Sequence, residues 1–420
     1  MPYHPRLMRP PRSRTALPLA LSLTLLTAAC AGPGGKGDGA DGGPGNAARG
    51  GPAGGGRPDE HLRSLPYVSW DEKADASLSG VTLHDARRAS PGFNLHTNDV
   101  DRVILSDMAG TEIRSWSLPP GKRQCEYAEL LPDGGVIVEC VDQSVVRLAS
   151  GSRVAWDLAL PAHHDIQQMG DGSFLVPYLE SRIYEGRDVG FDGIARVDAL
   201  GQPAKMWSTW ERFDELRSIH GPSLLDTPPP PASDPLEGRQ EGFEYYHLNS
   251  IQLLPATPLG REDRRFEEGN LLVCLRNIDT IAVLDRRDFA VTWSWGEGNL
   301  DLPHMPRMTP EGTILIFDNG TRRGWSRVIE IRPPGGEIVW SYEGRPRENF
   351  FSKWRGAVQR LPNGNTLITE SERGHVFEVT PEKETVWELW NPEIVDGKRK
   401  RIYRMLRFPP EEVEGLAPPS

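Results

Sequence analysis

The sequence predicts an all-β fold, a six-bladed β-propeller, because one short phrase occurs six times. Each copy is an apolar strand, a turn and a second strand ending in tryptophan, and the six tryptophans are Trp116, Trp156, Trp207, Trp293, Trp340 and Trp387. Consecutive tryptophans lie 40, 51, 86, 47 and 47 residues apart. Repeats of roughly 40–50 residues built from short strands are typical of propellers.

The other half of each repeat is a hairpin that precedes the tryptophan phrase in five repeats, as in AELLPDGGVIVE and VQRLPNGNTLIT. Asp-Gly and Asn-Gly between apolar runs are strong hairpin signals. We therefore expect four antiparallel strands per repeat. The first repeat is partly degenerate, because GFNLHTNDVDRVILSD supplies its only visible strands. No long stretch has a helical period, so little helix is expected.

The propeller and a C-terminal tail are expected over residues 75–420, with a long insertion at 211–246. Loops of that length often have a function. The insertion is therefore interpreted as a lid or substrate wall, and disorder is the equal alternative.

The N-terminus predicts export. Residues 1–29 contain four arginines, then an apolar run too short to span a bilayer, then small residues before Cys30. This pattern indicates a signal peptide of the lipoprotein type, with Cys30 as the lipidated residue. The alternative is an ordinary signal cut near Ala31. Residues 30–60 are rich in Gly and Pro and predict a flexible tether.

Such an anchor would place the protein at a membrane in an extracytoplasmic space. Ala31 is not an acidic retention residue, so the periplasmic face of the outer membrane is expected. Loss of residues 1–29 changes the net charge from −11 to −15, because that segment has four arginines and no acidic residue. A nucleic-acid partner is not expected at that charge.

Cys125 and Cys140 flank one hairpin and are a candidate disulfide, which an exported compartment permits. They would lie directly opposite each other if Pro132-Asp133 formed a two-residue turn. A shift of the turn by one position would spoil that pairing.

One position varies among otherwise similar hairpins. When the five hairpins are aligned on their turns, the residue six positions before the turn differs from one hairpin to the next. We call this the mouth position, and it is occupied by Glu126, His164, Asn249, His304 and Gly356. The first strand of every blade lines the central channel of a propeller, so these residues should meet around one mouth.

Two further residues are expected at this mouth. Strand alternation places His247 on the same face as Asn249, and Arg276 ends the partner strand. By the same rule His163 should point away from His164. A single His or Asn at a strand end most often caps a turn, but three histidines in neighbouring blades are harder to explain in that way.

Several His, an Asn and an Arg around a water-accessible funnel suit the transfer of an oxyanionic group. Fixed donors and a cation stabilise its charged oxygens, and a neutral imidazole can act as nucleophile. Converging histidines could instead bind zinc. Arg276 argues against that reading because a guanidinium repels a metal cation, so no metal or other cofactor is predicted.

The segments HHDIQQMGDGSF, YYHLNSIQLL, GNLLVCLRNIDTIAVLD, LPHMPRMTPEGTILIFDNG and AVQRLPNGNTLITES resemble the bacterial arylsulfate sulfotransferase family. The similarity covers about residues 90 to 410. It implies a six-bladed propeller enzyme that moves a sulfuryl group from an aryl sulfate to a phenol through a histidine, without a nucleotide donor.

By motif, the resemblance implies His304 as the covalent histidine. It implies that His164, His247, Asn249 and Arg276 hold the sulfate oxygens and the leaving phenol. The hydroxyl residue expected from a late blade is not evident, and Ser352 or Arg355 would have to replace it. Well-studied members carry an extra N-terminal β-domain, whereas only about thirty ordered residues are expected before the first blade here.

Two other functions remain open at this stage. A lipid-anchored propeller could be a non-catalytic scaffold at the cell envelope, because fold alone does not establish chemistry. A quinone-dependent dehydrogenase is a third hypothesis, but such an enzyme usually has eight blades and a calcium site, and the sequence shows neither.

Overall fold

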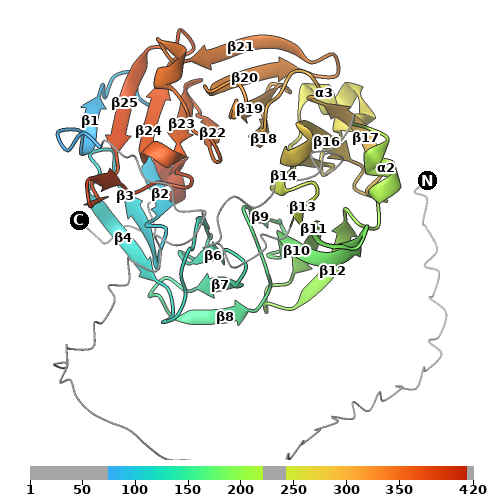
Figure 1. Cartoon of the computed structure of the whole chain (residues 1–420). Helices are drawn as coiled ribbons and strands as arrows, with labels where there is room; N and C mark the ends of the chain where they lie inside the picture. The colour runs from blue at the N-terminus through green and yellow to red at the C-terminus, as the bar shows by residue number, and fades with distance from the viewer. Residues whose placement is uncertain (1–73, 221–242, 414–420) are drawn as a thin grey trace, which may run out of the picture. The chain divides into compact units, whose positions relative to one another are not determined.

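The structure is a computed structural model that describes residues 74–220 and 243–413. The described residues form six β-sheets arranged around a common centre (Figure 1), and each sheet contributes four antiparallel strands to one blade. The predicted six-bladed propeller is therefore confirmed. The signal peptide, the tether, Cys30 and most of the 211–246 insertion lie outside the described residues.

From the innermost strand outward, blade 1 consists of β28 (Leu406–Phe408), β2 (Phe93–Thr97), β3 (Arg102–Ser106) and β4 (Glu112–Ser117). Blade 2 consists of β5 (Tyr127–Leu130), β6 (Val136–Cys140), β7 (Ser144–Leu148) and β8 (Val154–Leu158). Blade 3 consists of β9 (Gln167–Gln168), β10 (Phe174–Tyr184), β11 (Arg187–Val197) and β12 (Pro203–Ser208), with β13 (Phe243–Glu244) parallel to β11.

Blade 4 consists of β14 (Leu248–Leu253), β15 (Leu271–Leu275), β16 (Thr280–Leu284) and β17 (Val291–Trp295). Blade 5 consists of β18 (His304–Met308), β19 (Ile314–Asp318), β20 (Arg327–Arg332) and β21 (Glu337–Glu343). Blade 6 consists of β22 (Ala357–Arg360), β23 (Thr366–Glu370), β24 (His375–Val379) and β25 (Thr385–Trp390), with β1 (Gly80–His84) on its outer edge.

The remaining elements are short. The helices α2 (Phe213–Arg217), α3 (Pro258–Glu262) and α4 (Pro410–Val413) have at most five residues each. A small hairpin, β26 (Ile394–Val395) and β27 (Lys398–Arg399), follows blade 6. None of the helices in the described ranges is long and apolar enough to cross a membrane.

Both ends of the described chain close the ring. Strand β28 pairs with β2 and supplies the inner strand that the first repeat lacks in sequence. Strand β1 pairs with β25, so the outer edge of blade 6 comes from the N-terminal side (Figure 1). The tail expected to follow the propeller is thus part of its first blade.

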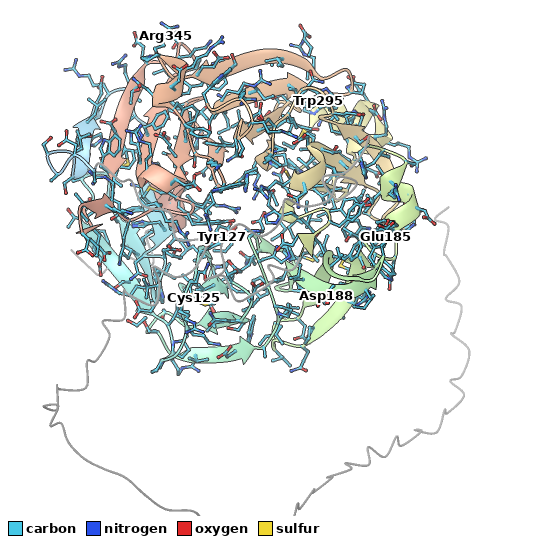
Figure 2. The ribbon with its side chains drawn as sticks, in the orientation of Figure 1. Cys125, Tyr127, Glu185, Asp188, Trp295 and Arg345 are labelled. Carbon is cyan, nitrogen blue, oxygen red and sulfur yellow. A yellow bond between two sulfur atoms is a disulfide. The ribbon has the colours of Figure 1, made fainter. Side chains whose placement is uncertain are left out.

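The segment that leads to β28 is fixed by buried ion pairs, and we call residues 399–407 the closing strap. Arg404 pairs with Asp165 at 2.7 Å, and its guanidinium lies 4.0 Å from the ring centroid of Tyr127, which is labelled near the centre of Figure 2. Arg401 pairs with Glu126 at 2.7 Å, and Arg407 pairs with Glu378. The strap is therefore tied to blades 2, 3 and 6.

The repeated tryptophans lie in the outermost strand of the four-stranded core of each blade, as predicted. Four of their indole N–H groups donate to a backbone carbonyl in the turn between the third and fourth strands of the next blade. These bonds run from Trp156 to Ala199, Trp293 to Pro334, Trp340 to Pro381 and Trp387 to Met108. These side chains therefore join neighbouring blades.

A second polar position joins the inner strands. Three residues after the mouth position, Gln167 accepts from the N–H of Leu253 at 3.2 Å, and Gln252 accepts from the N–H of Met308 at 2.7 Å. Gln359 likewise accepts from the N–H of Arg407 at 2.8 Å. Each amide crosses to the next inner strand, so this ring of side chains fixes the spacing of the blades at the channel.

Candidate active site

The mouth residues lie at the start of inner strands, but regular strand geometry does not place them. His164 and His247 precede β9 and β14, with φ of 68° and 55°, and Met305 after His304 has φ of 49°. The β14–β15 register shifts between Leu248 and Ser250, and the β18–β19 register shifts between His304 and Arg307. Left-handed non-glycine residues cost about 1–3 kcal/mol each and cluster at functional sites.

These backbone turns correct two predictions from strand alternation. His247 lies outside the strand, so the alternation that was used to align it with Asn249 does not apply. His163 does not point away from His164, because their ring centroids are 5.0 Å apart.

His304 is buried and held by an amide. Its Nδ1 lies 2.7 Å from Oδ1 of Asn319. The Nδ2 of Asn319 donates to the carbonyls of Ser352 at 2.7 Å and Arg355 at 2.8 Å, which fixes the orientation of the amide. Oδ1 can only accept, so Nδ1 of His304 carries the proton. The lone pair of the neutral ring is therefore on Nε2.

The surroundings of His304 favour that neutral form. Burial, and next the guanidinium of Arg276, hold the pKa of His304 well below its usual value. Nε2 has no hydrogen-bond partner among the described residues although it is buried. An imidazole with one nitrogen tied and the other unpartnered is suited to nucleophilic attack.

His164 and His247 form a second pair of imidazoles, with ring centroids 4.6 Å apart. Burial, followed by the proximity of His247, holds the pKa of His164 well below its usual value. Nδ1 of His164 contacts the hydroxyl of Tyr403 at 2.9 Å, so the closing strap contributes a side chain to this group. Nδ1 of His247 contacts Oε2 of Glu244.

His304 and the two other histidines influence each other electrostatically, as do Arg276 and Arg355 with His304. The structure thus brings together His164, His247, His304, Arg276 and Arg355. The guanidinium of Arg276 also lies 5.2 Å from the ring centroid of Trp354, which is partly exposed.

Asn249 reaches the same place from blade 4. Its Nδ2 donates to the carbonyl of Pro303 at 2.8 Å, directly before His304. One amide proton is engaged there, so only the second can reach a substrate oxygen. Asn249 therefore positions the backbone of His304 in addition to offering a donor.

The two remaining mouth positions have structural partners. Glu126 accepts from Arg355 at 3.3 Å as well as from Arg401. Gly356 faces the ring of Phe317, the cross-strand partner of His304, and a Cβ at Gly356 would lie 2.4 Å from that ring. A side chain at Gly356 would clash with Phe317, which pairs with His304 across β18 and β19.

Ser352 does not replace the missing hydroxyl. Its Oγ contacts Glu372, and its carbonyl accepts from Asn319. Arg355 is buried beside Glu126 and Glu372, and its positive charge acts on His164 and His304. Of the two candidates, Arg355 is the one directed at the histidines.

Cys125 and Cys140 are joined by a disulfide, with Cys125 labelled in Figure 2. The register that was expected to align them is wrong, because Leu131 pairs with Gly135 around a three-residue turn and Glu126 falls opposite Cys140. Gln124 has φ of 54°, so the chain before β5 leaves strand geometry. This bend brings Cys125 to its partner despite the shifted register.

Sequence reasoning missed three residues of this site. Asn319 belongs to the Phe-Asp-Asn-Gly motif and lies two residues past the partner of His304, which is a usable signal. Glu244 lies near the end of the 211–246 insertion and Tyr403 lies in the C-terminal tail, and neither segment has a repeat pattern that could have marked it. No group of three or more residues suited to hold a metal ion occurs in the part of the chain that the structure describes.

A family model described as arylsulfotransferase (ASST) matches residues 127–392, which is more than half of the chain. The chain belongs to the arylsulfotransferase family. Its members are transferases, and the match spans five of the six blades with His164, His247, Arg276 and His304. No curated protein matches this chain.

Solved structures similar to this arylsulfotransferase-family protein are distant. A protein of unknown function from Bacteroides caccae is 14% identical with a TM-score of 0.48, and the match covers 76% of this chain and 99% of that chain. A streptogramin B lyase is 11% identical with a TM-score of 0.45, over 80% and 94% of the two chains. Likeness this weak indicates no function for this chain.

Proposed function

We propose that this protein transfers a sulfuryl group from a phenolic sulfate ester to a phenol, without a nucleotide, through a sulfohistidine at His304. The observation that carries the proposal is the state of that ring. Asn319 ties Nδ1, while Nε2 is buried and has no partner among the described residues. Membership of the arylsulfotransferase family supports aryl sulfates as donors.

In the first half-reaction, Nε2 of His304 forms a bond to sulfur and the bond from sulfur to the aryl oxygen breaks. The leaving phenolate takes a proton from His164 or His247. In the second half-reaction, an acceptor phenol gives its proton to the same histidine and attacks sulfur. The N–S bond breaks, and its electrons return to His304.

The charge of the transferred group is spread over its oxygens, so fixed donors stabilise the transition state. In this proposal Arg276 and the second amide proton of Asn249 donate to those oxygens, and Arg355, whose charge acts on His304, adds positive charge nearby. Imidazole suits the proton-transfer role because its ordinary pKa lies near neutrality.

We also propose that Cys30 is acylated and holds the protein at the periplasmic face of the outer membrane. The basic and apolar N-terminal segment before Cys30 supports this. Cys30→Ser should move the protein from the membrane fraction to the soluble fraction. Unchanged membrane association of the variant would disprove acylation as the anchor.

The function is tested by incubating the protein with a chromogenic aryl sulfate, with and without added phenol. We expect release of the chromophore to depend on phenol and to follow ping-pong kinetics, since a covalent intermediate separates the two substrates. If no phenol supports release, the non-catalytic scaffold becomes the better account.

A further inference from the structure

We propose that Glu244 is a positioning residue that orients His247, and that the Glu244–His247 pair, not His164, moves the proton during sulfuryl transfer. The inference rests on the proposed function and assigns one of its two open roles. It comes from the contact between Nδ1 of His247 and Oε2 of Glu244.

Glu244 is held in place by its backbone. Strand β13 pairs in parallel with β11, and the N–H of Tyr245 donates to the carbonyl of Gly190 at 2.9 Å. On the other side, Nδ2 of Asn277 donates to the carbonyl of Glu244 at 2.8 Å. Glu244 is therefore held between blades 3 and 4, and its carboxylate contacts His247.

The carboxylate defines the tautomer of His247. Burial raises the pKa of Glu244, but the proximity of His247 and its hydrogen bond outweigh this and lower the pKa to about 2. An ionised carboxylate can only accept, so Nδ1 of His247 carries a proton and Nε2 is left for the reaction. A carboxylate at Nδ1 also favours the imidazolium that forms when Nε2 takes a proton.

The neighbouring histidines lack such a partner. Nδ1 of His164 contacts only the hydroxyl of Tyr403 among the interactions of the described residues, and the ring is kept neutral by burial. Nε2 of His163 lies 3.5 Å from Oδ1 of Asp192. Burial, and then the charge of Glu244, raise the pKa of Asp192 well above its usual value, which disfavours its ionised form.

The other charges that face this pair come from three elements. Arg276 follows β15 and acts on Glu244, His163 precedes β9, and His304 begins β18. The positive charge of Arg276 alone would oppose a second cation in the site. Glu244 offsets it, which allows His247 to hold a proton beside the guanidinium.

The step balances with these groups. While Nε2 of His304 bonds to sulfur, the breaking S–O bond leaves its electron pair on the aryl oxygen, which takes the proton from Nε2 of His247. The acceptor phenol returns that proton to Nε2 of His247 as its oxygen attacks sulfur. The proton on Nδ1 stays on His247 throughout, hydrogen-bonded to Glu244.

The test compares Glu244→Gln with the matched control Glu267→Gln, whose carboxylate pairs with Arg286 on the surface and is similarly exposed. Donors with a range of leaving phenols are used. General acid catalysis contributes roughly 10²–10⁴-fold. We expect Glu244→Gln to lose about 10²-fold with phenyl sulfate but far less with 4-nitrophenyl sulfate, since a good leaving group needs little protonation.

A double-variant comparison provides the second readout. In a His247→Gln background, Glu244→Gln should cause no additional loss. Thermal unfolding of each variant shows whether it is folded.

Three results would overturn the inference. One is a folded Glu244→Gln variant with an equal loss for all donors, and another is a Glu244→Gln variant that behaves like Glu267→Gln. The third is an additional loss in the His247→Gln background. If the unaltered protein transfers sulfate to no phenol, the proposed function fails and the inference falls with it, whereas the first three results leave that function standing.

Discussion

At the scale of single residues, the site depends on one amide and one guanidinium beside His304. Asn319 fixes the tautomer, because its own N–H groups are committed to the Ser352 and Arg355 carbonyls. Arg276 and burial keep the ring neutral. The neighbours of His304 therefore keep its ring neutral, with the proton on Nδ1.

Replacing Asn319 should disturb the protonation state of His304. Asn319→Ala removes Oδ1, the acceptor for Nδ1 of His304, together with the donors to the Ser352 and Arg355 carbonyls. We expect kcat to fall roughly 10–10²-fold, below the loss for the nucleophile itself, because Nδ1 loses its acceptor. Steady-state kinetics with one donor and saturating phenol measure it, and an unchanged kcat would contradict the tautomer assignment.

Arg276→Ala should lower kcat/KM about 10²–10³-fold, the scale for one lost oxyanion donor. The change also removes the cation that depresses the pKa of His304. Arg286→Ala, an exposed arginine on the same blade, is the control and should have no effect. Equal activity of the two variants would show that Arg276 does not serve the transferred group.

The site was predictable residue by residue only in part. The mouth position identified His164, Asn249 and His304 because it varies while the hairpin around it repeats. The geometry behind it was not predictable, since left-handed residues such as His164 and Met305 break the alternation on which strand reasoning depends. Tyr403 contacts His164 only through long-range folding, and Glu244 is three residues before His247 but belongs to no repeated pattern.

At the scale of secondary-structure elements, blade-to-blade contacts are made by side chains at repeated positions. Gln252 shows the principle, because its Oε1 accepts from the N–H of Met308 in the next inner strand. Gln252→Ala should lower the free energy of unfolding by about 1–3 kcal/mol, the cost of a buried N–H left without a partner. Chemical denaturation measures the loss, and exposed Gln202→Ala is a control expected to show none.

His375 in β24 makes stability depend on pH. Burial lowers its pKa, but hydrogen bonds to Glu370 at 2.8 Å and Glu388 at 2.9 Å outweigh this and raise it above the usual value. A raised histidine pKa stabilises the fold fully below the unfolded value of about 6.5 and loses this as pH rises through the folded value.

The Tm difference between the unaltered protein and His375→Gln should therefore be largest near pH 5.5 and shrink towards pH 9. Exposed His84→Gln serves as the control and should show no pH-dependent difference. A difference for His375→Gln that grows with pH would contradict the assignment.

At the scale of the whole molecule, the chain closes the propeller with both of its described ends. The repeat count predicted six blades, because the tryptophans recur at 40–51-residue intervals except for the 86 residues that include the insertion. Which segment completes blade 1 was not predictable, since β28 has only three residues and no turn signal. Its position depends on buried charges in the closing strap.

Breaking one of the buried ion pairs of the closing strap should destabilise the propeller. Arg407 and Glu378 are both almost completely buried, so Arg407→Met leaves an uncompensated carboxylate and should cost about 3–5 kcal/mol. Arg407→Met combined with Glu378→Leu should recover much of that loss, because no unpaired charge remains. A single variant as stable as the unaltered protein would show that the pair does not secure the strap.

The central claim is that His304 carries the sulfuryl group between two phenols. The most direct measurement is incubation with a ³⁵S-labelled aryl sulfate in the absence of phenol, followed by rapid quenching at alkaline pH and peptide mapping. We predict label on the peptide containing His304, loss of that label when phenol is added, and no label in His304→Ala. Label on another residue, or phenol-dependent transfer by His304→Ala at the normal rate, would contradict the account.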